Sequence, residues 1–443
     1  MFKLSFLLIG AEAFRARWYV LGVLGAALIA GAIFLAFHAS SGIVVVAGRV
    51  VGFVFIFMGL GNALRLLDHT HLVARALTFA RAIALIAIGA VVIHWPGHSE
   101  RILAALFCVV FLVDGIGRIG IGLLVHLPDW RSRALYGSVE LAFAVLFFTG
   151  WPLPLERSIP LCVGLIFALR GWMLIRFSLM FRTLENEAAI LSLPIFATRG
   201  WYANAPVLVD DQETELVENP LTVHVWTPAG SAAVAQHLPV IDRYVAAIDA
   251  KGVISTGHAS MEMLPSLYIS HYPAVELDRS TADFVTALRG TPENDVEGRF
   301  QPSYAYEVGE WCAADAHVEF RNFNPRRLRA FWAGYRQDNT YNLTNRNCSV
   351  VVAQALDAAL EGSLATRSPW LQLVILLANP DVWIGATLRS RAYLSTWTPG
   401  LVLDYARTMA RIVEKQDVSW SASLSRFLRR LWQDRAGSTG AAA

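Results

Sequence analysis

Long apolar stretches alternate with short polar segments over about the first 180 residues of the chain. Each stretch is close to the ~20 residues that a helix needs to cross the hydrocarbon core of a bilayer. The pattern predicts six membrane-spanning helices, at residues 17–37, 43–67, 76–92, 102–125, 135–151 and 159–181. Charged residues make up 16% of the chain, against about a quarter in soluble domains, which also favours a membrane protein.

The predicted spans form three related hairpins. Residues 59–62 (GLGN) in the second span match residues 115–118 (GIGR) in the fourth, and residues 169–172 (LRGW) follow in the sixth. Small residues let helices pack closely where lipid offers no hydrophobic drive for association. This repeat, over residues 15–185, resembles the HdeD family of small bacterial membrane proteins, which is associated with acid resistance. The resemblance implies a multi-pass protein of the bacterial inner membrane.

Basic residues gather on one side of the predicted bundle. Seven lie in the N-terminal segment and in the second and fourth loops, and two lie in the three opposite loops. The positive-inside rule therefore predicts a cytoplasmic N-terminus, and six crossings return the chain to the cytoplasm. The 37 basic and 35 acidic residues of the whole chain nearly cancel, which argues against a nucleic-acid partner.

Asp114 and Arg118 lie one helical turn apart at membrane depth, and Glu140 lies in the next span. An isolated charge in the bilayer is costly, so we expect these side chains to pair. They fit either a proton or ion path, or a buried pair that holds the bundle together.

The composition becomes more polar after the sixth span. We expect a membrane domain at 1–182, a linker at 183–220, an α+β domain at 221–365 and a helical tail at 366–443. Within the tail, residues 370–388 are apolar but interrupted by Asn379-Pro380-Asp381, which fits a pair of helices on the membrane surface or one that caps the domain. Residues 419–434 predict a basic amphipathic helix, for anionic lipid or for docking.

Cys348 is the candidate nucleophile. It follows Asn347, a good helix N-cap, and precedes an apolar helix that ends at Gly362. A helix N-terminus lowers the pKa of a thiol, and its free N–H groups can hold an oxyanion. His258 and His271, on two neighbouring predicted strands, are the candidate base and orienting group. Tyr268, Ser270 and Tyr272 are alternatives for the orienting group.

The order of these residues is similar to that of circularly permuted NlpC-type papain-like enzymes. The lecithin:retinol acyltransferase family has His, His and an NCxxxV motif, which maps onto His258, His271 and residues 347–352. Residues 341–349 (YNLTNRNCS) also resemble a bacterial family with periplasmic, lipoprotein-modifying relatives. The resemblance covers residues 221–362 and implies a permuted papain-like fold with amidase, peptidase, thioesterase or acyltransferase activity.

We therefore expect a membrane-anchored thiol hydrolase or acyltransferase that acts on an amide or ester through Cys348, His258 and His271. Lipids, lipidated proteins and peptides are its candidate substrates, in a cytoplasmic catalytic domain without cofactor or metal. The alternatives are a membrane stress-resistance or transport protein whose soluble domain is a non-catalytic binding module, and a degenerate papain-like interaction module. The oligomeric state stays open. Cys312 is interpreted as structural, because it has no asparagine cap and no helix is predicted after it.

Overall fold

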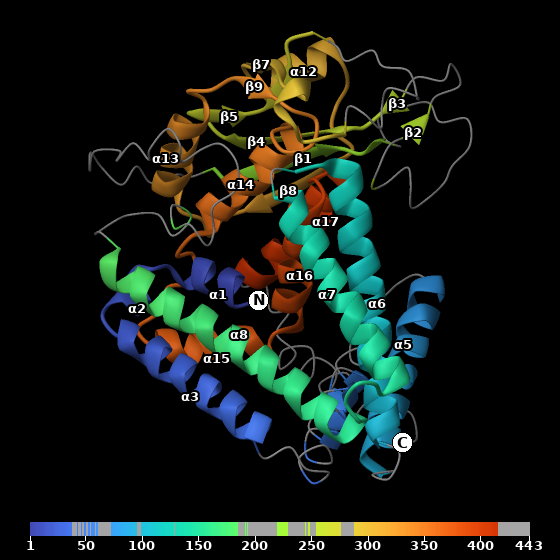
Figure 1. The fold of residues 1–443 in the computed structure, drawn as a ribbon. Helices are drawn as coiled ribbons and strands as arrows, with labels where there is room; N and C mark the ends of the chain where they lie inside the picture. Colours follow the sequence, from blue (N-terminus) through green and yellow to red (C-terminus); the bar gives the residue numbers. More distant parts are fainter. Residues whose placement is uncertain are drawn as a thin grey trace, which may run out of the picture.

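The computed structural model describes residues 1–37, 72–94, 99–127, 129–184, 219–228, 254–275 and 288–414, and isolated positions between them. An N-terminal helical part carries the apolar spans, and a C-terminal region combines small antiparallel sheets with helices (Figure 1). The predicted linker at 183–220 and the predicted helix at 419–434 lie largely or wholly outside the described residues.

Four helices are long and apolar enough to cross a membrane. They are α3 (Trp18–Phe37), α6 (Ser99–Val125), α7 (Trp130–Thr149) and α8 (Leu155–Thr183). These helices confirm four of the six predicted spans. The span at 76–92 falls in α5 (Leu72–His94), where the stretch that qualifies as apolar is the shorter Ala82–His94, and the span at 43–67 falls mostly outside the described residues.

Glycines bring the long helices together in pairs. A Cβ on Gly25 of α3 would lie 2.5 Å from the carbonyl oxygen of Gly171 of α8, and a Cβ on Gly171 would be equally close to Gly25. Gly115 of α6 and Gly137 of α7 approach each other in the same way, at 2.8 Å. No side chain fits at such distances, so these crossings require glycine.

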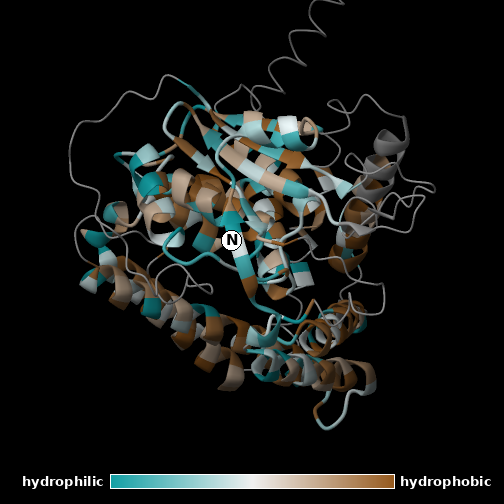
Figure 2. Ribbon diagram, turned by 90° about the horizontal axis from the view of Figure 1, so that it is seen from above, coloured by the Kyte–Doolittle hydropathy of each residue, from teal (hydrophilic) through white to brown (hydrophobic). Residues whose placement is uncertain are grey.

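The pairs follow the predicted repeat but join different helices. The repeated glycine of each even-numbered span meets the following odd-numbered span, and the sixth span closes back onto the first. The hairpin repeats of the sequence are therefore not the packing units: α8 pairs with α3, and α6 pairs with α7. Viewed from above, much of the length of these helices is apolar (Figure 2).

The C-terminal region contains a four-stranded antiparallel sheet in the order β5-β4-β1-β8. Its strands are β1 (Leu221–Trp226), β4 (His258–Met263), β5 (Leu267–Ile269) and β8 (Ala316–Phe320). A smaller sheet joins β6 (His271–Pro273), β7 (Val296–Phe300) and β9 (Thr340–Tyr341), and β2 (Ala247–Ile248) pairs with β3 (Ile254–Ser255). Val223 and Val225, alternate residues of β1, both enter the core.

Helices cover the sheet. They are α12 (Tyr304–Glu310), α13 (Pro325–Tyr335), α14 (Cys348–Leu360), α15 (Pro369–Ala378), α16 (Pro380–Leu394) and α17 (Pro399–Val413), with the short η3 (Pro292–Asn294). Every residue of α14 is buried, because one side of the helix packs on the sheet and the other on α17 and the N-terminus. The predicted helix start at Asn347 is confirmed, since this asparagine caps α14, and Asn324 caps α13 in the same way.

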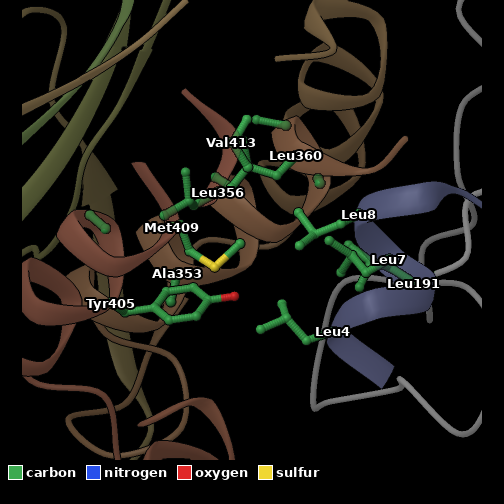
Figure 3. Packing of buried hydrophobic residues seen from close by; sticks show 14 of the residues in the cluster. Leu4, Leu7, Leu8, Leu191, Ala353, Leu356, Leu360, Tyr405, Met409 and Val413 are labelled. Atoms are coloured by element: carbon green, nitrogen blue, oxygen red, sulfur yellow. The ribbon is translucent and has the colours of Figure 1, made fainter. Parts of the chain in front are cut away.

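The first residues of the chain belong to the same core. Leu4, Leu7 and Leu8 of α1 (Phe2–Ile9) face Leu360 of α14 and Met409 of α17 (Figure 3). The N–H groups of Gly362 and Leu364 also donate to the carbonyls of Leu7 and Leu8, at 2.9 and 2.8 Å. The short α2 (Glu12–Arg15) then leads into α3. One cluster of buried residues thus includes side chains on both sides of positions 182 and 365.

Candidate active site

Cys348 is the first residue of α14. The Oδ1 atom of Asn347 accepts the N–H of Val350 at 2.8 Å and so caps the helix. The amide of Asn347 donates to the carbonyls of Leu343 and Trp397, at 2.6 and 3.2 Å. The Cys348 side chain is buried, with 8% of the residue exposed. These contacts hold the thiol where the free N–H groups of the first helical turn converge.

His258 lies beside the thiol, at the start of β4. Gly257 precedes it with a φ of +70°, and a Cβ there would lie 2.3 Å from the carbonyl of Trp226, so only glycine allows this approach of the two strands. The side chains of His258 and Cys348 lie close enough for each to shift the pKa of the other. The Nε2 atom of His258 is engaged elsewhere, and its Nδ1 atom is buried without a hydrogen-bond partner among the described residues. We infer that Nδ1 faces the sulfur.

Glu307 of α12 holds the far side of the imidazole. Its Oε1 atom lies 3.1 Å from Nε2 of His258 and accepts the hydroxyl of Ser270 at 2.6 Å. Its Oε2 atom accepts the hydroxyl of Tyr268. Ser270 Oγ is also 2.9 Å from Nε2 of His258. A buried carboxylate thus fixes the ring orientation and offers a negative charge to an imidazolium.

The electrostatics favour an ion pair between Cys348 and His258. Burial raises the pKa of Cys348, but the nearby charge of His258 and the N–H of Ala259 outweigh burial, so the thiol pKa is lowered. Burial likewise opposes charging of His258, yet the thiolate and Glu307 together raise its pKa. The pKa of Glu307 is lowered despite burial, because His258, Ser270 and Tyr268 hydrogen-bond to its carboxylate.

The structure does not bring His271 to His258. Ser270 and His271 are adjacent, and successive side chains of an extended chain point in opposite directions. Ser270 therefore faces His258, whereas His271 enters the smaller sheet. There its Nδ1 atom lies 3.0 Å from the hydroxyl of Tyr335, and its Nε2–H donates to the carbonyl of Asn339 at 3.2 Å. Burial lowers the pKa of His271 to about 4.

The three alternative orienting residues all lie near the imidazole. Ser270 contacts His258 directly, and Tyr268 acts through Glu307. The ring of Tyr272 packs edge-on against that of His258, with centroids 5.1 Å apart. The orienting position itself belongs to Glu307, which sequence reasoning missed.

A signal for Glu307 is present in the sequence. Tyr304, Glu307 and Trp311 follow an i, i+3, i+7 spacing, which places them on one helical face. The rings of Tyr304 and Trp311 both pack against Trp226, with centroids 5.8 Å apart in each pair. A single carboxylate on an otherwise aromatic, inward face is the mark of a buried polar contact.

Cys312 provides a contrast within the same region. Its carbonyl accepts the indole N–H of Trp226 at 2.9 Å, and its thiol is half-buried. Burial and the nearby Asp315 raise the pKa of this thiol. Among the described residues, no group of three His, Cys, Asp or Glu side chains is arranged to hold a metal ion.

Comparisons with protein-family models, with curated proteins and with solved structures find no match. The resemblances to the HdeD and papain-like families therefore depend on the residues quoted for them.

Proposed function

We propose that the chain is a membrane-anchored thiol hydrolase or acyltransferase, in which Cys348 is the nucleophile, His258 the proton carrier and Glu307 the orienting group. One observation carries this proposal. A thiol at a capped helix N-terminus lies beside an imidazole whose Nε2 atom is held by a buried carboxylate. This is the arrangement by which enzymes activate a cysteine.

The chemistry follows from the ion pair. The Cys348 thiolate bonds to the carbonyl carbon of an amide or ester, and the N–H groups at the start of α14 stabilise the oxyanion. The His258 imidazolium gives its proton to the leaving nitrogen or oxygen, the C–N or C–O bond breaks, and an acyl-thioester remains. Water or an acceptor then loses a proton to His258 and bonds to the acyl carbon. The C–S bond breaks, and the thiolate–imidazolium pair is restored.

The location of the site is also a proposal. The turn after α6 contacts the catalytic region, since the N–H of Gly290 donates to the carbonyl of Val125 at 2.7 Å. This turn is one of the loops rich in basic residues, for which the positive-inside rule favours the cytoplasm. A free catalytic thiol fits that reducing compartment. Amides and esters within reach of the inner leaflet are then the substrates.

Acyl-enzyme trapping tests the proposal. We expect full-length protein in lipid nanodiscs to release p-nitrophenol from a p-nitrophenyl acyl ester and to retain the acyl group on the peptide that contains Cys348. Cys348→Ala should lose both signals, and Cys312→Ala should keep both. Acylation of neither cysteine, or equal acylation of both, would contradict an enzyme and favour a domain that only binds.

A further inference from the structure

The helices α15 and α16 form a pair that bends by 79° at Asn379 and, taken together, is apolar enough to count as a membrane segment. One side of the pair packs on the core through Leu373, Leu376 and Val382. The other side also carries large apolar residues, and Leu371 and Val374 are each 62% exposed. The remaining exposed apolar residues are Ile375, Trp383 and Ile384. A helix that is apolar all round is buried in protein or lies in lipid.

Several polar groups of the pair find hydrogen-bond partners within it. The indole N–H of Trp383 donates to the carbonyl of Leu377 at 2.8 Å, across the bend. The hydroxyls of Thr387 and Ser390 donate to carbonyls of their own helix, at 2.8 and 2.5 Å. Asn379 caps α16 by accepting the N–H of Asp381 at 2.9 Å. Hydrocarbon demands this internal satisfaction, and water does not.

Both ends of the pair are held on one side of the spanning helices. At the start of α15, the ring of Trp370 packs edge-on against Phe14, shortly before α3 begins, with centroids 5.2 Å apart. At the end of α16, Arg133 in the first turn of α7 donates to the carbonyl of Leu394 at 2.6 Å. The N-terminal ends of α3 and α7 belong to the same side in the predicted topology, so the pair enters and leaves there.

An ion pair sets the depth of α16. Arg391 lies 2.7 Å from Asp114, and Asp114 directly precedes Gly115, where α6 crosses α7. Arg118 bonds to Asp114 and to Glu140, at 2.9 and 3.0 Å. Two acids and two bases thus form a paired network level with the middle of an apolar hairpin. Figure 1 shows α16 between the α3–α8 pair and the α6–α7 pair, and α15 overlapping α3 and α8 in this view.

The repeat explains why this hairpin carries the charges. When the crossing glycines Gly59, Gly115 and Gly171 are aligned, 56 residues apart, the positions equivalent to Asp114 hold Met58 and Arg170. An acid at this point is therefore not a property of the bundle. It belongs to the hairpin that receives Arg391, which makes docking of α16 a better explanation of Asp114 than a proton path.

We infer that α15 and α16 form a re-entrant helix pair, whose outward face contacts the acyl chains of the bilayer. The spanning helices also expose large apolar residues, and the Asp114–Arg391 contact sets the depth of α16 beside them. This inference does not depend on the proposed activity, because lipid contact and catalysis are measured separately.

Photo-crosslinking from within the bilayer tests the inference on the unmodified chain. Full-length protein is placed in vesicles of phosphatidylcholine that carries a diazirine at the end of an acyl chain, and labelled peptides are mapped by mass spectrometry. We expect peptides from 369–394 to be labelled as those of α7 are, and peptides of α13 to remain unlabelled. Val374→Lys should remove the label from α15. The matched control is Leu264→Lys, at an exposed apolar residue of the sheet region, which should leave the label unchanged.

The membrane topology of the pair provides a second test of the inference. A short epitope between Thr366 and Arg367 and another after residue 443 should be accessible from the same side of the membrane. Epitopes on opposite sides would mean that the pair crosses the bilayer, and would overturn the inference. Labelled spans with unlabelled 369–394 would also overturn it, and crosslinks between two copies at Val374 would identify a second chain as the occupant.

Discussion

The regions around His258 and His271 are both buried, and the two residues lie 13 positions apart on strands of two different sheets. Around His258 the partners are a thiol, a carboxylate and a serine hydroxyl. Around His271 they are a tyrosine hydroxyl, a backbone carbonyl and the rings of Phe300 and Tyr341. The pKa is raised in the first region and lowered in the second.

The difference shows that burial alone does not decide the charge of an imidazole. Burial lowers the histidine pKa in both regions. The groups around His258 become anionic and reverse the effect, whereas around His271 the positive charge of Arg346 opposes the pull of Asp338. One region is therefore suited to moving protons, and the other to holding α13 against the smaller sheet with a neutral ring.

The largest expected effect concerns the nucleophile of the first region. Cys348→Ser keeps a hydroxyl in place of the thiol but removes the easily formed thiolate, so we expect acyl transfer to fall by several orders of magnitude. Ester turnover by the full-length protein in nanodiscs measures this change. Turnover comparable to that of the unmodified protein would remove Cys348 from the mechanism.

The second-largest effect on activity is expected from loss of the base, His258. His258→Gln removes the charge that lowers the Cys348 pKa, so the pH at which alkylation of Cys348 reaches half its maximum rate should rise. Acyl transfer should fall by roughly 10²–10⁴-fold, the usual contribution of a general acid–base group. Iodoacetamide labelling between pH 5 and 9 measures the profile, with Cys312 as the internal reference. An unshifted profile would show that another group activates the thiol.

Loss of the orienting carboxylate should have a smaller effect than loss of the base. Glu307→Gln keeps a hydrogen-bond acceptor for His258 but removes the negative charge that stabilises the imidazolium. We therefore expect turnover to fall by less than in His258→Gln, with a rise in the Cys348 pKa. The matched control is Glu310→Gln, at an exposed residue of the same helix, which should leave both quantities unchanged. If Glu307→Gln and Glu310→Gln have the same turnover and the same Cys348 pKa, Glu307 does not orient His258.

The smallest effect on activity is expected in the second region, where stability should respond instead. His271→Gln should leave the alkylation profile of Cys348 unchanged and reduce stability by about 1–3 kcal/mol, the cost of leaving buried polar partners unsatisfied. The unfolded chain protonates this histidine below about pH 6.5, and the folded chain only near pH 4. Native stability is thus lost as the pH falls between these values.

Thermal unfolding at pH 7 and pH 4.5 checks this sign. The fall in the unfolding midpoint between the two pH values should be smaller in His271→Gln than in the unmodified protein. Some fall in the midpoint should remain in His271→Gln, because burial also lowers the pKa of His224 to about 4. A shifted alkylation profile in this variant would return His271 to the catalytic site.

The sequence predicted the features that depend on neighbouring residues, and it missed those that depend on tertiary contacts. Asn347 before an apolar helix predicts the position of Cys348 at the helix start, since capping involves only neighbouring residues. The glycine repeat predicts close helix crossings, but not that the sixth span pairs with the first. Glu307 lies 49 residues from His258 in sequence. The sequence signals this tertiary contact only through the helical spacing of the residues around Glu307.

The contact between the first helix and the end of α14 has a consequence for how the protein is made. Leu7 and Leu8 receive their backbone partners from Gly362 and Leu364. At a synthesis rate of roughly 5–20 residues per second, these partners leave the ribosome some 20–70 s after the N-terminus. The apolar first helix must wait through the insertion of every span before its own site exists. A membrane surface that shelters it in the meantime would make the bilayer a folding aid as well as an anchor.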